Sequence, residues 1–288
     1  MNKLNILVTG SKGFVGSKTV KLLEERGHKV SRFDLMDKND IRTIDPVTSG
    51  LANSGIDVIL HLAAIARFSD ADRDPWTAYM TNVKGTENVV RLAEWNKARI
   101  VYSSTGSVYM PIEQEPPITE DMQCRGNSVY GVTKYLGELA VRASKTPWIV
   151  LRYAHLYGKE KRGHGLVGAF VDRINRGLVP TLYGGSQSND FTYIDDVARA
   201  NVLACEASWD KWNDIYNIGT GEELSAEAAS KILFEEMGYV GKVDKIKQRT
   251  VDAQRFVFNT SKAESKLGFK AEYDFRSGIK KMLEEMDV

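Results

Sequence analysis

The sequence predicts an α/β fold in which one doubly wound parallel sheet is covered by helices on both faces. Short β-rich apolar runs alternate with longer amphipathic stretches, which is typical of a parallel sheet with crossover helices. The chain has 288 residues, enough for one large α/β domain or two smaller ones. With 42% hydrophobic and 27% charged residues, it has the composition of a globular protein with a packed core.

The regular alternation occupies the first part of the chain. Apolar runs predict strands at Asn5–Thr9, Lys29–Asp34, Val58–Leu62, Arg99–Ser104 and Trp148–Tyr153. Apolar residues at helical spacing predict helices at Phe14–Arg26, Trp76–Trp95 and Ser128–Ser144. We therefore expect residues 1–157 to form one domain built on the parallel sheet.

A polar segment rich in glycine and lysine follows Tyr157 and breaks the alternation. Beyond it, helices are predicted at Val167–Arg176, Asp195–Ala207, Ala226–Met237, Ser261–Leu267 and Phe275–Glu285, and a short strand at Ile215–Ile218. We expect residues 158–288 to form mainly a smaller C-terminal α/β lobe, with segments near residues 186–216 returning to the first domain.

Charge and cysteine content exclude several classes of protein. Lys and Arg number 39 against 38 Asp and Glu, so the net charge of +1 gives no electrostatic footprint for nucleic acid. The two cysteines, Cys124 and Cys205, are too few for a disulfide framework, and no Cys or His cluster has metal-ligand spacing. The longest apolar stretch, Val58–Ala66, is too short to span a membrane. We expect a cytoplasmic protein without a metal, nucleic-acid or membrane partner.

A glycine-rich loop connects the first predicted strand to the first predicted helix. Glycines at 10, 13 and 16 suit a tight turn, a close backbone approach to a pyrophosphate and close packing of helix on strand. Because a strand precedes the loop and a helix follows it, the context matches a Rossmann-type dinucleotide site in residues 1–157. The candidate cofactor-binding residues here are Gly10, Lys12, Gly13, Phe14, Val15 and Gly16.

Asp34 ends the second predicted strand, 18 residues after Gly16. This is near the spacing of the acid that accepts hydrogen bonds from the adenosine ribose, and a carboxylate there repels a 2′-phosphate. The sequence therefore favours NAD over NADP, although the cation Lys12 can offset part of the repulsion.

Tyr130 and Lys134 lie one turn apart on a predicted helix and share one face. A neighbouring ammonium lowers the pKa of a phenol, which lets the tyrosine remove a hydroxyl proton while hydride leaves the same carbon. The strand before this helix ends in hydroxyl residues at the ligand edge of the sheet, where Ser104 or Thr105 can hydrogen-bond the reacting oxygen.

The glycine loop, the hydroxyl-rich strand end and Tyr130-x-x-x-Lys134 follow one another in this order. With these motifs, nearly the whole chain resembles the extended short-chain dehydrogenase/reductases. Within them it is most similar to the NAD-dependent nucleotide-sugar epimerase/dehydratase branch. The resemblance implies that NAD is also contacted by residues at the predicted strand ends and helices, namely Asp40, Ile41, Leu62, Ala63, Ala64, Asn82, Ser103 and Tyr153, besides Tyr130 and Lys134.

The resemblance also implies a mechanism and a substrate. Tyr130 takes the proton of the sugar 4-hydroxyl while hydride passes to NAD, Thr105 holds the oxygen, and Lys134 binds the nicotinamide ribose. The substrate is a nucleotide-diphosphate sugar, contacted by Ser104, Thr105, Ser107, His155, Asn189 and Arg249. The chain is most similar to UDP-glucose 4-epimerases, and many relatives form homodimers through the helices predicted at 76–95 and 128–144.

Three departures from the family pattern bear on the reaction. Gly106 and Ser107 stand where the 4,6-dehydratases carry Asp-Glu, which disfavours dehydration. His155 and Asn189 replace the usual Asn and Arg at the nucleotide, and a neutral amide does not replace a guanidinium that binds phosphate through two hydrogen bonds. A C4 epimerase is the leading hypothesis. The alternatives are an NAD(P)-dependent 4-keto-sugar reductase or other net oxidoreductase, and a non-catalytic dinucleotide-sensing protein.

Overall fold

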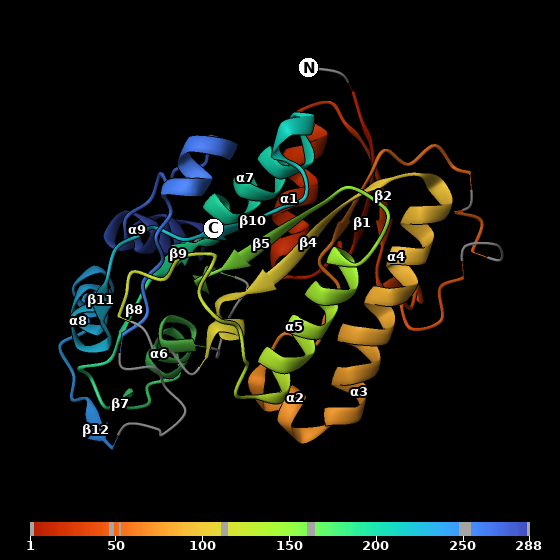
Figure 1. The fold of residues 1–288 in the computed structure, drawn as a ribbon. Helices are drawn as coiled ribbons and strands as arrows, with labels where there is room; N and C mark the ends of the chain where they lie inside the picture. The colour runs from red at the N-terminus through yellow and green to blue at the C-terminus, as the bar shows by residue number, and fades with distance from the viewer. Residues whose placement is uncertain are drawn as a thin grey trace.

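A six-stranded parallel sheet forms the centre of the molecule (Figure 1). The computed structural model describes residues 3–45, 49–51, 53–110, 115–159, 165–247 and 255–286. The strands of the sheet are β1 (Asn5–Thr9), β2 (Lys29–Phe33), β3 (Val58–His61), β4 (Arg99–Thr105), β5 (Trp148–Tyr153) and β10 (Asp214–Ile218). Their order is β10-β5-β4-β3-β1-β2, with every neighbouring pair parallel. The predicted doubly wound sheet is confirmed.

Helices cover both faces of this sheet. In Figure 1, α1 (Phe14–Glu25) and α7 (Ile194–Cys205) lie on one face, and α4 (Gly85–Asn96) and α5 (Val129–Arg142) on the other. In β1, Ile6 and Val8 pack into the core beside α1 and α7, whereas Leu7 packs into the core beside α4. A strand buried on both faces needs an unbroken apolar run, which is what the sequence of β1 provides.

The helix predicted at Trp76–Trp95 forms, with an irregularity at its centre. It consists of α3 (Pro75–Tyr79), a π-helical turn η2 (Met80–Lys84) and α4, and a short helix α2 (Phe68–Arg73) precedes it. The Asp74 carboxylate accepts a hydrogen bond from the backbone N–H of Thr77 and so caps the start of α3. The π-helical turn was not predicted, because apolar periodicity does not register one extra residue in a turn.

Among its described residues, the C-terminal lobe is built from helices and three two-stranded sheets (Figure 1, left). Its helices are α6 (Gly165–Asn175), α8 (Ala226–Glu236) and α9 (Phe275–Met286), and its strand pairs are β6 (His155–Tyr157) with β9 (Phe191–Tyr193), β7 (Thr181–Tyr183) with β12 (Asp244–Ile246), and β8 (Ser188–Asn189) with β11 (Leu224–Ser225). The closing helix predicted at Ser261–Leu267 is mostly a π-helical turn, η5 (Ala263–Leu267). Pairs of two or three residues are too short for periodicity to detect.

Late segments of the chain complete the central sheet. β10 pairs with β5, and α7 packs against α1. Short 3₁₀ turns follow two central strands, η1 (Leu35–Asp37) after β2 and η3 (Gly106–Tyr109) after β4, and a third, η4 (Trp209–Lys211), precedes β10. The domain boundary at residue 157 stays a prediction.

The sheet places a crevice where the chain changes direction. From β1 the chain goes to β2 on one side and returns to β3 on the other, so the loops after β1 and β3 diverge at this point. Ligands of open α/β sheets bind at such switch points, at the carboxyl ends of the strands. β4 and β5 end at the same edge, with Thr105 and Tyr153.

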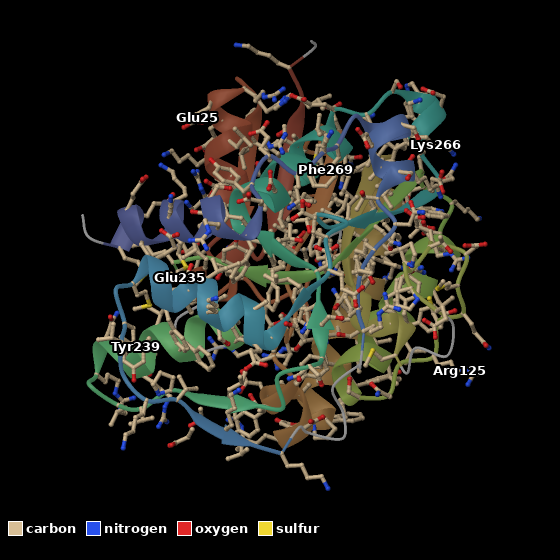
Figure 2. The ribbon with its side chains drawn as sticks, turned by 90° about the vertical axis from the view of Figure 1, so that its left-hand side faces the viewer. Glu25, Arg125, Glu235, Tyr239, Lys266 and Phe269 are labelled. Carbon is tan, nitrogen blue, oxygen red and sulfur yellow. The ribbon has the colours of Figure 1, made fainter. Side chains whose placement is uncertain are left out.

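Polar and apolar side chains separate as expected for a protein with a packed core. In Figure 2, charged side chains such as Glu25 and Lys266 lie at the periphery, whereas Phe269 lies in the interior, where it is fully buried. Within the described ranges, no helix combines the length and the apolar character that crossing a bilayer requires.

Candidate active site

The glycine loop between β1 and α1 leaves room for a bound phosphate. Gly10 has a φ of +68°, and a Cβ atom there would lie 2.7 Å from the backbone nitrogen of Ala63. A Cβ atom on Gly16 would lie 2.0 Å from the carbonyl oxygen of Gly10. α1 begins at Phe14, so the positive end of its dipole faces the loop. The buried Ser11 hydroxyl has no hydrogen-bond partner within the described residues. The loop therefore offers both space and an unused polar group.

Asp34 follows β2 and is almost fully buried. One carboxylate oxygen accepts a hydrogen bond from the backbone N–H of Lys12 at 2.8 Å, and the other accepts one from Met36 at 2.9 Å. Each oxygen keeps a second acceptor position, which suits a ribose hydroxyl. The Lys12 ammonium forms an ion pair with Asp37 instead. It is therefore directed away from Asp34, and the repulsion of a 2′-phosphate stays in force.

Asp40 and Ile41, both predicted to contact the cofactor, are held by their neighbours. The Asp40 carboxylate accepts hydrogen bonds from the Arg42 guanidinium at 2.9 and 3.0 Å, which hold the pKa of Asp40 below its usual value. Ile41 is buried and packs against Gly85. A Cβ atom on Gly85 would lie 2.7 Å from the Cδ1 atom of Ile41. Both residues lie after β2, and their contacts with a cofactor stay predictions.

Asn82 clamps the loop that follows β3 onto α5. Its side-chain oxygen accepts from the Ile65 N–H at 2.8 Å, and its amide donates to the Ile65 carbonyl and to the Thr133 hydroxyl. Both amide hydrogens are therefore used within the protein. Asn82 thus fixes the loop that carries the half-buried Leu62, Ala63 and Ala64, and a direct contact with NAD stays a prediction.

Tyr130 and Thr105 meet between α5 and the end of β4. The Ser128 hydroxyl caps α5 by accepting from the Gly131 N–H at 3.1 Å, which places Tyr130 in the first turn. The Thr105 side chain lies close enough to the Tyr130 phenol to lower the pKa of Tyr130. The edge of the Phe68 ring lies against the Tyr130 ring, with the centroids 5.2 Å apart. The structure thus brings the predicted base and the predicted hydroxyl into direct contact.

Lys134 lies one turn beyond Tyr130 and is buried, with 3% of its surface exposed. Its ammonium is 4.3 Å from the centre of the Tyr102 ring, and the Tyr102 hydroxyl donates to the Lys134 carbonyl at 3.1 Å. Burial lowers the pKa of Lys134 to about 7, against the opposing attraction of Glu138. Lys134 can therefore exchange its proton near neutral pH.

The pKa of Tyr130 corrects one expectation. We expected the Lys134 ammonium to lower the pKa of the phenol, but in the structure burial raises this pKa, and the neighbouring Thr105 side chain opposes the rise only in part. The physical reason is that the same burial that disfavours the phenolate also weakens the charge of Lys134.

The neighbouring hydroxyl residues have different partners. Ser104 donates to the Glu138 carboxylate at 2.9 Å. Thr105 accepts from the Ser107 N–H and donates to the Ser107 hydroxyl, both at 3.2 Å. Two hydroxyls were candidates to hydrogen-bond the reacting oxygen. The Thr105 hydroxyl faces Tyr130, whereas the Ser104 hydroxyl faces Glu138 on the buried side of α5.

Two further predicted cofactor residues point their polar groups into the protein. The Ser103 hydroxyl donates to the carbonyl of His61 at 3.0 Å and ties β4 to β3. The Tyr153 hydroxyl donates to the Asn201 side chain on α7 at 2.6 Å. These bonds fix the strand ends, so any contact with a cofactor would involve the remaining atoms of Ser103 and the ring of Tyr153.

The predicted nucleotide-contacting residues are only partly described. His155 opens β6 and is exposed, with its ring edge-on to Phe256 at 5.1 Å between centroids. Asn189 lies in β8 and pairs with Leu224 of β11. Arg249 lies outside the described residues. Binding of a diphosphate by these three residues stays a prediction.

Sequence reasoning missed two features of the site. A Cβ atom on Gly106, directly after Thr105, would lie 2.2 Å from the Phe256 ring, so this late segment packs on the end of β4. Glu138 pairs with Arg152 in the core beneath Thr105 and Lys134. The sequence did contain a signal for Glu138, because this residue continues the four-residue spacing of Tyr130 and Lys134. No local pattern marks Phe256.

Comparisons with known proteins agree with this geometry. The model of the NAD dependent epimerase/dehydratase family matches residues 6–219. A putative UDP-glucose 4-epimerase from Methanocaldococcus jannaschii is 31% identical, over 98% of both chains. A UDP-glucose 4-epimerase from Thermotoga maritima, solved with UDP-glucose, superposes with a TM-score of 0.87 at 28% identity over 99% of both chains. A UDP-glucuronic acid 4-epimerase from Bacillus cereus, solved with UDP-glucuronic acid and NAD, superposes with a TM-score of 0.85 at 26% identity over 99% of both chains.

Proposed function

We propose that this chain, which belongs to the NAD dependent epimerase/dehydratase family, is an NAD-dependent epimerase that inverts C4 of a UDP-sugar through a transient 4-keto sugar. The observation that carries the proposal is the contact of Thr105 with Tyr130, one helical turn from the buried Lys134. The similarity to UDP-glucose 4-epimerases over 98% or more of the chain supports the choice of reaction and of nucleotide.

The residues have separate tasks in this reaction. Tyr130 accepts the proton of the sugar 4-hydroxyl, and Thr105 hydrogen-bonds the same oxygen as it becomes a carbonyl. The protonated form of Lys134 stabilises the Tyr130 phenolate, which burial otherwise disfavours. NAD would be held by the glycine loop and by Asp34, and when bound it would supply the hydride acceptor and donor for C4. Inversion follows if the keto sugar presents its other face before the hydride returns.

The residues at the switch point fit NAD. The glycine loop has no room for a Cβ atom at Gly10 or Gly16, and the unpartnered Ser11 hydroxyl is available to a phosphate oxygen. Asp34 keeps free acceptor positions for the adenosine ribose. The ion pair of Lys12 with Asp37 leaves the Asp34 carboxylate to select NAD against NADP.

The test is an isomerisation assay without added cofactor. We expect purified protein to release close to one equivalent of NAD or NADH per subunit on denaturation, and to interconvert UDP-glucose and UDP-galactose or another C4 pair. Tyr130→Phe should lower kcat by about 10² to 10⁴-fold. Tyr135→Phe, on the same helix, is the matched control and should retain activity. An empty site that binds NADP reversibly, with net reduction of a keto sugar, would refute the proposal.

A second copy of the chain is the partner we propose. The outer face of α5 exposes Val132, Leu136 and Leu139, and α3 adds Trp76 stacked on Tyr79. Apolar side chains grouped in this way mark a protein interface. We expect a dimer by sedimentation velocity and a monomer for Leu136→Glu, and a monomeric wild type would refute this.

The free thiols of Cys124 and Cys205 fit a reducing compartment, and we propose that the enzyme acts in the cytoplasm.

A further inference from the structure

We propose that Glu138 is a positioning residue for this reaction: held by Arg152, its carboxylate fixes the end of β4 against α5 so that Thr105 faces Tyr130, and it keeps a negative charge one helical turn from Lys134. The inference rests on the proposed function, because it assigns Glu138 a part in the same proton transfer.

The first observation is the position of Glu138 on α5. Tyr130, Lys134 and Glu138 follow one another at intervals of four residues, so all three side chains lie on the helix face that meets the sheet. Glu138 has no exposed surface, and Arg152 of β5 is 1% exposed. Two charges are therefore buried here, one on the helix that carries the base of the reaction and one on β5.

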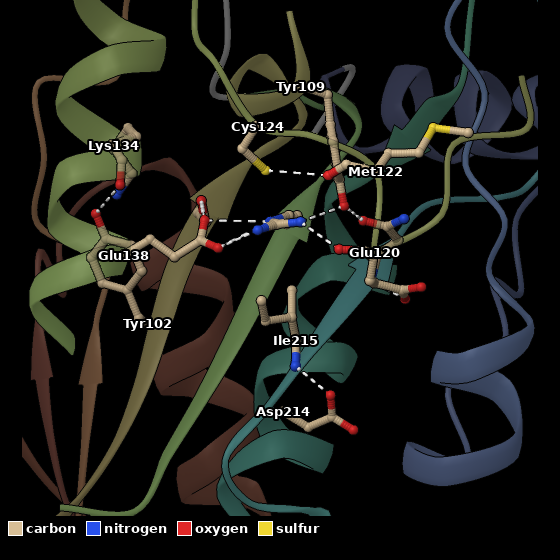
Figure 3. Close-up of polar contacts among 12 residues, drawn as sticks. Tyr102, Tyr109, Glu120, Met122, Cys124, Lys134, Glu138, Asp214 and Ile215 are labelled. Atoms are coloured by element: carbon tan, nitrogen blue, oxygen red, sulfur yellow. Dashed lines mark hydrogen bonds and ion pairs between the residues drawn. The ribbon is translucent and has the colours of Figure 1, made fainter. Parts of the chain in front are cut away.

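The second observation is what the Glu138 carboxylate binds. It accepts a hydrogen bond from the Ser104 hydroxyl at 2.9 Å and from the Arg152 Nε atom at 3.1 Å, and it forms an ion pair with the Arg152 Nη2 atom (Figure 3). Ser104 directly precedes Thr105 in β4. The Glu138 side chain thus connects α5 to two neighbouring strands, β4 and β5. In β4 it binds the residue directly before Thr105.

The third observation is that Arg152 also binds other segments of the chain. Its Nη1 atom donates to the Tyr109 hydroxyl at 2.7 Å and to the Glu120 carbonyl at 3.1 Å (Figure 3). The Tyr109 hydroxyl donates in turn to the Asn217 side chain of β10 at 2.8 Å. All three nitrogen atoms of the guanidinium therefore have partners, which fixes the orientation of Arg152 and, through it, of Glu138.

The charges around Lys134 show why a carboxylate is placed here. On β4 the Tyr102 ring faces its ammonium, and on β3 the buried His61 is neutral, because burial and Lys134 lower the pKa of His61 to about 3. On α5 itself the ionisable neighbours are Tyr130 and Glu138. Glu138 is thus the anionic group that faces Lys134 among the described residues, and its attraction raises the pKa of Lys134 against the effect of burial.

A purely structural role would not require these charges. A buried ion pair contributes little net stability compared with apolar side chains of similar volume, because both charges lose their hydration. What an ion pair does provide is a fixed geometry and a local field. The Glu138–Arg152 ion pair lies between β4, which carries Thr105, and α5, which carries Tyr130 and Lys134. The geometry that it fixes is therefore that of the reacting side chains.

The test compares Glu138→Gln with a matched control. Glu138→Gln keeps the size of the side chain and removes its charge. Without the carboxylate, Lys134 loses its proton at lower pH. We expect kcat to fall about tenfold or more with KM changed little, and the pH range of activity to narrow because its upper limit moves to lower pH. Asp196→Asn removes another fully buried carboxylate, which pairs with Arg199 on α7, and should lower the melting temperature without changing the pH profile.

Two further measurements keep the proposal falsifiable. If Glu138→Gln does not fold, the double variant Glu138→Met with Arg152→Met removes both charges together and should fold, yet show the same loss of kcat and the same narrowed pH range. Glu138→Asp keeps the charge and should recover the pH profile in part. A variant without the charge whose kcat and pH profile match those of the wild type would overturn the proposal.

The failure of the proposed function can be recognised separately. The ionisation of Lys134 can be titrated by nuclear magnetic resonance of its side chain, without any substrate. A wild type that isomerises no nucleotide sugar refutes the proposed function only. A Lys134 titration that is the same in the wild type and in Glu138→Gln refutes the role of Glu138.

Discussion

Replacing His61 by glutamine tests the electrostatics of the buried layer beneath the site. His61 ends β3 and is fully enclosed. Its Nδ1 atom accepts from the Thr9 hydroxyl at 2.7 Å, and its Nε2 atom donates to the Thr86 hydroxyl at 3.0 Å, because the hydrogen of Thr86 goes to the Asn82 carbonyl. These bonds require the neutral imidazole. Burial first, and then the charge of Lys134, lower its pKa from 6.5 to about 3.

The size of the effect follows from this pKa difference. As the pH falls below 6.5, the unfolded chain binds a proton at His61 that the folded protein does not bind, so the free energy of unfolding decreases. Between pH 7.5 and pH 5 the decrease from this residue amounts to about 2 kcal/mol. Because the folded pKa lies well below 5, the value depends only on the pKa in the unfolded chain. The loss continues until the pH reaches the folded pKa.

The assay is urea unfolding followed by circular dichroism at pH 7.5, 6 and 5. A glutamine can still donate to Thr86 but does not titrate, and all other ionisable groups are common to both proteins. The wild type should therefore lose about 2 kcal/mol more stability than His61→Gln over this interval. Parallel dependence of the two proteins on pH would refute the reasoning, since it would show that the folded protein accommodates a protonated His61.

Three further predictions concern the cofactor and the reacting oxygen. Gly16→Ala puts a methyl group 2.0 Å from the carbonyl oxygen of Gly10, so the NAD released on denaturation should fall below about a tenth of an equivalent; a folded variant with full NAD content would contradict this. Asp34→Ser should weaken NAD about tenfold and strengthen NADP by calorimetry; an unchanged preference would show that Asp34 does not contact the ribose. Thr105→Ala should lower kcat about 10²-fold at nearly constant KM, because it removes a hydrogen bond to the oxygen shared with Tyr130; an increase in KM alone would mean that Thr105 only binds the sugar.

The alternation of elements and the local motifs were predictable from the sequence because they depend on residues close together in the chain. β1 and its glycine loop are an example: an unbroken apolar run predicts a strand buried on both faces, and Gly10 and Gly16 meet within a single turn. Likewise Tyr130 and Lys134 share a face because a helix repeats every 3.6 residues. All five strands predicted in the first part of the chain lie within one residue of their observed bounds.

Tertiary structure decided which groups meet across the fold and what their charge is. The residues by themselves left both Ser104 and Thr105 open, and the family resemblance favoured Thr105. The packing of β4 on α5 directs Ser104 to Glu138 and Thr105 to Tyr130. The pKa of Tyr130 is raised rather than lowered for the same reason, since burial is a property of the assembled core. Contacts between distant strands and helices, and the loss of water around them, arise only when the chain has folded, and no local spacing encodes them.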